Sequence, residues 1–98
     1  MDIIDALVAR EKRAAAGRAL QSRSRAWKRE VEHARWKRPT YVKAVFGSAD
    51  IIGGTRIVFD ICGNNYRLVV DVNYAGGVVR IRFAGNHVEY NNIDARTV

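Results

Sequence analysis

Residues 56–84 read RIVFDICGNNYRLVVDVNYAGGVVRIRFA, and this stretch decides the fold. Apolar and polar residues alternate in three runs, and a period of two is typical of strands that are buried on one face. The runs are separated by CGNN and by AGG, which supply the glycine and asparagine that tight hairpin turns require. The stretch therefore predicts a three-stranded antiparallel meander.

The residues before this stretch favour helices. Residues 6–16, ALVAREKRAAA, are strong helix formers that follow an N-cap residue, Asp5, and Gly17 interrupts them. Pro39, the only proline, closes this region and permits a short helical turn, TYVKAVF, to follow. MDII at the start of the chain is either a short edge strand or an entry segment. A second helix has its apolar or small residues at the spacing of one buried stripe: Leu20, Ser24, Trp27, Val31 and Ala34.

Helices first and strands after predict one α+β domain over residues 1–98, with N-terminal helices packed on one face of a small antiparallel sheet. We expect residues 1–38 to be helical and basic, and residues 39–98 to hold the short turn, the meander and a C-terminal turn. No apolar run approaches the roughly 18 residues that a membrane span needs. The single cysteine, Cys62, suits a buried position in a reducing compartment. We therefore expect a cytoplasmic protein without a membrane partner.

The charge of the chain indicates an acidic partner. The formal net charge is +7 and the pI is about 10.2, which suits binding to nucleic acid or to an acidic protein surface. Residues 1–38 hold eleven Lys and Arg against five Asp and Glu, so most of the excess belongs to the helical part. A solvated helix face explains the same excess, and the two interpretations stay open.

One face of the predicted sheet collects arginine. Side chains at i and i+2 share a face, so we expect Val79, Ile81 and Phe83 on the apolar face and Ala84 on the other. The same reasoning leaves four arginines on the face that the helices do not cover: Arg56, Arg67, Arg80 and Arg82. Guanidinium groups suit bidentate contacts to phosphate. Pairing with Asp60 and Asp71 across the strands is the structural alternative.

A histidine and a tyrosine follow the last strand. If HVEYNNID, residues 87–94, makes a helical turn, His87 and Tyr90 lie on one side of it. Histidine takes or gives a proton near neutrality, and tyrosine can donate to a phosphate oxygen; a structural, hydrogen-bonded histidine is the alternative. The sequence has no P-loop, no GxGxxG and no G-x-S-x-G elbow, and one Cys with two distant His makes no metal-ligand pattern. We expect neither a metal nor a cofactor.

Several pieces of the chain occur together in one known family. Trp36 precedes a short turn, and the pieces VKAVF, VFDICGNNYRLV, IRFAGNHVEY and IDA follow in order. Over residues 27–98 the chain resembles the HigB-type toxins of bacterial type II toxin–antitoxin modules. Such toxins usually have threonine and aspartate where this chain has Asn86 and Asn91.

The resemblance implies a RelE-like fold and metal-independent cleavage of mRNA at the ribosome, by attack of the ribose 2′-OH on the adjacent phosphate. It implies three partners: mRNA, the ribosome and a cognate helix-turn-helix antitoxin. Such a reaction needs a base, an acid and positive charge beside the phosphate. We expect His87 to transfer the proton, Arg67 to brace the phosphate and Tyr90 and Lys43 to assist. We expect three further residues to bind RNA: Arg56, Arg80 and Arg82.

A non-catalytic basic RNA-binding module is the alternative function. The uncovered sheet face shows no aromatic stacking platform of the kind that single-strand binders use. The sequence also shows no helix-turn-helix with a recognisable recognition helix, which makes DNA reading the third choice.

Overall fold

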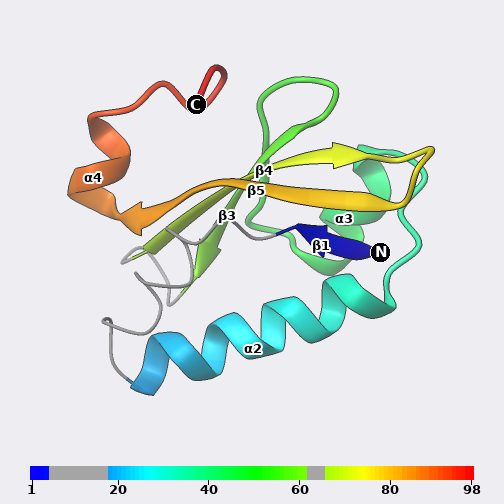
Figure 1. Cartoon of the computed structure of the whole chain (residues 1–98), viewed down its shortest axis with the longest axis horizontal. Coiled ribbons are helices and arrows are strands. Elements are labelled where there is room, and N and C mark those ends of the chain that lie inside the picture. The colour runs from blue at the N-terminus through cyan, green and yellow to red at the C-terminus, as the bar shows by residue number, and fades with distance from the viewer. Residues whose placement is uncertain (5–17, 62–65) are drawn as a thin grey trace.

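The computed structural model describes residues 1–4, 18–61 and 66–98 of the chain (Figure 1). The predicted helix over residues 6–16 lies outside the described residues, as do Asp5, Gly17, Cys62, the turn CGNN and the side chain of Leu20. The elements in chain order are β1 (Asp2–Ile4), α2 (Arg18–His33), α3 (Pro39–Val45), β2 (Asp50–Ile51), β3 (Arg56–Ile61), β4 (Tyr66–Asn73), β5 (Val78–Asn86) and α4 (His87–Asn91).

Within the described residues, five strands form one sheet in the order β1-β5-β4-β3-β2. The predicted meander of β3, β4 and β5 is confirmed as antiparallel. MDII supplies the edge strand β1, which runs parallel to β5, so the sheet that the described residues form is mixed rather than antiparallel throughout. Two parallel strands need a long connection between them. The connection from β1 to β5 contains helices α2 and α3. Strand β2 was not predicted from the sequence, because a strand of two residues is too short to show an alternating pattern.

The start of β1 is tied to the end of α2. The α-amino group of Met1 donates hydrogen bonds to the carbonyl oxygens of Val31, Glu32 and Ala34, at 3.0, 2.9 and 3.0 Å. The last carbonyls of a helix have no partner within the helix, and a positive group is favourable beside them. The contact therefore connects the edge strand with the helical layer.

Helices α2 and α3 cover one face of the sheet, and the hydrophobic core lies between this helical layer and the sheet (Figure 1). Trp27 and Val31 of the predicted α2 stripe are buried there. The ring of Phe59 is the centre of an aromatic cluster. Its centroid lies 5.4 Å from that of Trp27, 6.3 Å from that of Trp36 and 5.0 Å from that of Phe46. Edge-to-face and offset contacts between rings stabilise the fold beyond the contribution from the burial of the rings.

One extra residue in β5 changes which side chains face the helices. Val70 pairs with Ile81 but Val69 pairs with Phe83, so β5 has a bulge at Arg82. Past the bulge, Ala84 faces the core and is 2% exposed, whereas Phe83 lies on the other face beside Val69. The expected placement of Phe83 and Ala84 is therefore wrong, because strict alternation does not survive an inserted residue.

The face that α2 and α3 leave uncovered is called the arginine face below. Three rows of cross-strand partners run over it through β3, β4 and β5. Two charged rows are separated by an apolar one: Arg56–Asp71–Arg80, Val58–Val69–Phe83 and Asp60–Arg67–Gly85.

Replacing Phe59 with alanine should lower the free energy of unfolding by about 3 to 5 kcal/mol, because the lost ring leaves a cavity in the aromatic cluster. Phe83→Ala removes a ring of equal size from the half-buried arginine face and should cost distinctly less. Equilibrium unfolding in urea measures both changes. Equal losses would place Phe83 in the main core and contradict the bulge.

Candidate functional site

Helix α4 begins at the residue after β5, and a capping box holds this junction. Oδ1 of Asn86 accepts a hydrogen bond from the backbone N–H of Glu89 at 2.8 Å, and Oε1 of Glu89 accepts one from the N–H of Asn86 at 3.1 Å. Asparagine caps a helix at least as well as threonine. Asn86 therefore caps α4 at the position where the resemblance leads one to expect threonine.

The predicted helical turn after the last strand is confirmed. His87 is the first residue of α4 and is exposed, and Tyr90 follows three residues later and is half-buried. The ring of Tyr90 leans on Phe83, with 6.4 Å between the ring centroids. The bulge in β5 is therefore what supplies a packing surface for α4 on the arginine face.

Arg67 extends from β4 to this same place. Its Nε lies 3.1 Å from Oδ1 of Asp60, the residue opposite it in β3. Its guanidinium carbon lies 5.8 Å from the centroid of the Tyr90 ring, over the ring face. The Arg67 side chain is only 13% exposed and that of Asp60 25%. One guanidinium thus joins β3, β4 and α4.

The ion pair leaves part of this guanidinium without a partner. Asp60 engages Nε, while Nη1 of Arg67 is buried and makes no hydrogen bond to the described residues. A buried donor left unpaired costs about 1 to 3 kcal/mol, and more when the group is charged. An anionic oxygen beside Arg67 would remove that cost with a charge-assisted hydrogen bond. Because Nη1 is buried, an anion would reach it only after the guanidinium shifts toward solvent.

The other predicted arginines lie further along the arginine face. Nη1 of Arg56 donates hydrogen bonds to the carbonyl oxygens of Ala95, at 3.2 Å, and Val98, at 2.7 Å. Arg56 therefore holds the segment that follows α4, and the structure does not bring it to Arg67. Arg80 and Arg82 of β5 are exposed.

A cavity of about 490 Å³ lies beside Arg80 at the hairpin end of this face. Burial raises the pKa of Tyr74, one of its lining residues. The cavity combines charged, polar and apolar walls: Ile4, Thr55, Asp71, Asn73, Tyr74 and Arg80 are among them.

Lys43 is not part of the cluster around Arg67. Its Nζ donates hydrogen bonds to the carbonyl oxygens of Gly47, at 2.7 Å, and Ala49, at 2.8 Å, and so holds the turn after α3. Figure 1 shows α3 and α4 at opposite ends of the molecule. The structure therefore does not bring Lys43 to His87 and Arg67, contrary to the expectation.

Phe83 and Gly85 are parts of the site that the sequence did not indicate. Parity assigned Phe83 to the core, and no local signal reveals a bulge. The capping box Asn86–Glu89 was readable, since N-x-x-E after a strand is a helix-start signature. Asp60 was named as an arginine partner, and the pairing alternative is confirmed for Arg67.

The described residues hold neither a cluster of metal ligands nor a helix that could span a membrane. No group of three or more His, Cys, Asp or Glu side chains there could hold a metal ion. None of the helices in that part of the chain has the length and apolar character needed to cross a membrane.

Comparison with known proteins gives one family. The model of the family HigB_toxin, described as the RelE-like toxic component of a toxin-antitoxin system, matches residues 21–93. No curated protein matches the chain. The matched range includes β3, β4, β5 and α4, and therefore the whole cluster around Arg67.

Gly85→Ala tests how closely α4 packs on the sheet. Gly85 lies opposite Arg67, and a Cβ there would lie 2.7 Å from Cζ of Phe83 and 3.2 Å from Cβ of Glu89. We expect the variant to lose about 1 to 3 kcal/mol of stability, as overpacked sites do. Gly47→Ala is the matched control, because nothing lies within 4 Å of its Cβ position. Thermal unfolding compares the two, and equal melting temperatures would contradict the close packing.

Proposed function

The chain belongs to the HigB toxins, the RelE-like toxic components of toxin–antitoxin systems, and from this premise we propose that it is an endoribonuclease that cleaves mRNA on the ribosome and so stops translation. The observation that carries the proposal is the cluster at the foot of α4. There the guanidinium of Arg67, whose Nη1 has no hydrogen-bond partner among the described residues, lies under the ring of Tyr90. Tyr90 belongs to α4, and the first residue of that helix, His87, is exposed.

Each group of the cluster has a task in the proposed reaction. The ribose 2′-OH attacks the adjacent phosphorus, the bond to the 5′-oxygen breaks, and a 2′,3′-cyclic phosphate and a free 5′-OH result. His87 is exposed and can transfer the protons of the reaction, which leave the 2′-OH and are gained by the 5′-oxygen. Proton transfer by a side chain typically contributes a factor on the order of 10² to 10⁴ in rate. Arg67 stabilises the charge that develops on the phosphate oxygens. The need for the 2′-OH restricts the activity to RNA.

Tyr90 assists by holding Arg67 in place and by presenting a hydroxyl near the phosphate. Its ring covers the guanidinium, and its half-buried position on Phe83 keeps the ring from swinging away. Lys43 has no place in this proposal, since its Nζ serves the turn after α3.

The RNA is proposed to approach along β5. Arg80 and Arg82 are exposed on this strand, and the seven residue steps from Arg80 to His87 correspond to about 23 Å at roughly 3.3 Å per residue. Contacts over that length give room for several nucleotides, with the cavity beside Arg80 at the far end. Arg56 contributes to RNA binding indirectly, because it holds the segment after α4, which forms one border of the proposed RNA path.

The partners follow from the same proposal. The net charge of +7 favours association with mRNA and ribosomal RNA in the cytoplasm, where translation takes place. A toxin of this kind must be kept inactive in its own cell, and we propose that a small helix-turn-helix antitoxin does so. The reaction as proposed runs on protein side chains alone, without a metal or cofactor.

His87→Ala and Arg67→Ala should each abolish growth arrest and lower transcript cleavage by about 10² to 10⁴, because each removes a group that acts in the reaction. Both should stay folded in a thermal melt. Val88→Ala is the control, since Val88 lies on the same helix and is 68% exposed. A folded His87→Ala protein that cuts RNA at the unchanged rate would make this histidine structural. A protein that binds RNA and never cuts it would be the non-catalytic RNA-binding module.

Asp60→Asn should slow cleavage by about 10- to 100-fold, because the released guanidinium of Arg67 is no longer aimed at the phosphate. Asp71→Asn removes the same charge from the same face and should leave the rate within a few-fold of the original. Both variants are compared by rate at saturating RNA and by RNA affinity. Equal effects of the two would show that Asp60 acts only through the total charge of the face.

A further inference from the structure

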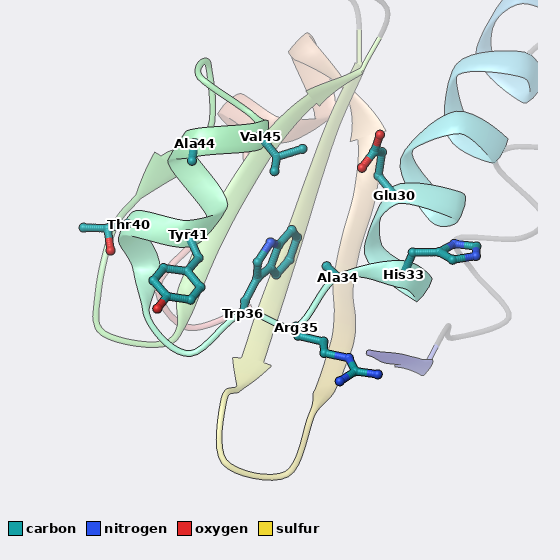
Figure 2. Close-up of a pocket in the computed structure, with 9 residues that line it drawn as sticks. All are labelled: Glu30, His33, Ala34, Arg35, Trp36, Thr40, Tyr41, Ala44 and Val45. Atoms are coloured by element: carbon teal, nitrogen blue, oxygen red, sulfur yellow. The ribbon is translucent and has the colours of Figure 1, made fainter.

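A groove lies between the end of α2 and α3, away from the cluster around Arg67 (Figure 2). Its volume is about 390 Å³, within the range of about 300 to 1,000 Å³ that binding pockets occupy. Trp36 forms its floor and is 4% exposed. Tyr41 and Val45 of α3 border it and are 41% and 52% exposed.

Tyr41 and Val45 are large apolar side chains that are exposed to solvent. The described residues expose four large apolar side chains, and Tyr41 and Val45 are two of them. The other two, Ile4 and Val88, lie on β1 and α4. Tyr41 and Val45 therefore place apolar surface that solvent reaches on the wall of one groove, above the buried ring of Trp36.

The two ends of the groove differ in charge. Figure 2 shows Glu30 near Val45 at one end and Arg35 at the other. The guanidinium carbon of Arg38 lies 5.4 Å from the centroid of the Tyr41 ring, and Lys37 between these arginines is also exposed. The ring of His33 turns away from the groove, with Nδ1 2.8 Å from the carbonyl oxygen of Arg29. A partner therefore meets apolar walls and a basic end.

We propose that this groove is the docking site of the antitoxin, which inserts one face of an amphipathic helix. Two apolar side chains of that helix, spaced three or four residues apart, cover Tyr41, Val45 and Trp36, and a carboxylate faces Arg35 and Arg38. Helix α3 has seven residues, about 10 Å of length, which matches two anchors one turn apart. The proposal rests on the family, which implies an antitoxin, and does not depend on the proposed RNA cleavage.

A nucleic acid is a poorer occupant of this groove. Phosphates would contact Arg35, Lys37 and Arg38 but would leave the apolar walls exposed to water. A protein helix satisfies both features, since it buries the apolar side chains and pairs the basic end.

The location separates antitoxin binding from the proposed cleavage site. The groove belongs to the helices that cover the core face of the sheet, whereas Arg67 and Tyr90 meet on the arginine face. The sheet lies between them. An antitoxin helix docked in the groove leaves His87 exposed.

Hydroxyl-radical labelling of the toxin–antitoxin complex, read by mass spectrometry, tests the location on the unaltered chain. The protein tested as antitoxin is the product of the reading frame that adjoins this chain's own, co-expressed with the chain. We expect labelling of Tyr41 to fall several-fold on binding and labelling of His87 to stay unchanged. Protection of His87, with or without Tyr41, overturns the proposal, and so does a complex that protects neither residue. Failure of the two proteins to form a complex overturns it as well.

A pair of matched variants tests the energetics. Val45→Asp places a charge on the groove wall and should weaken antitoxin binding by about 30-fold or more, the loss expected at a central contact. Val88→Asp introduces the same charge on α4 and should leave the affinity within about threefold. Both positions are exposed, so both variants should fold, which circular dichroism verifies. The opposite order of effects would place the antitoxin over α4. Weakening by Arg35→Glu but not by Val45→Asp would show a purely electrostatic contact and refute the helix-in-groove interface.

RNA cleavage is measured separately on the free protein. A chain that binds its antitoxin through the groove but cuts no RNA refutes the proposed function and leaves the docking site in place.

Discussion

The bulge in β5 is the constraint on which the rest of the arginine face depends. One residue, Arg82, has no partner of its own between the pairs Val69–Phe83 and Val70–Ile81. Without it, Phe83 would follow Val79 and Ile81 into the core, and the arginine face would have no ring to support Tyr90. With it, Ala84 fills the core position, and Gly85 lies opposite Arg67. A helix can then start at His87 close against the sheet.

The ion pair between Arg67 and Asp60 matters for orientation more than for stability. Pairs near the surface contribute about 0 to 1 kcal/mol, and a buried Nη1 of Arg67 with no partner among the described residues costs at least as much. The cluster is therefore not the arrangement that would make the fold most stable. It holds a charged group in one direction, with Asp60 on the Nε edge and Tyr90 over the plane. That combination suits a site that meets an anion.

Local periodicity predicted the features that are themselves local. The meander, the Trp27–Val31 stripe of α2 and the helical turn at His87 follow from residues that are near one another in the chain. The missed features depend on distant residues. The parallel pairing of β1 with β5 joins the two ends of the chain, and the bulge depends on how β4 and β5 align over their whole length. Arg56 looked free because the carbonyls that bind it, those of Ala95 and Val98, lie about forty residues away in the chain.

The sheet separates two surfaces of different chemistry, and this separation bears on how such a protein is kept inactive. Arg67 lies on the arginine face and His87 begins the helix whose Tyr90 packs against that face, whereas the helical layer carries the apolar groove with Tyr41 and Val45. If both proposals hold, the antitoxin cannot work by filling the cleavage site. It must act by its bulk, by preventing the toxin from entering the confined space of the ribosome. A small free RNA would then still reach His87 in the complex, because nothing docked on the opposite layer blocks the approach along β5.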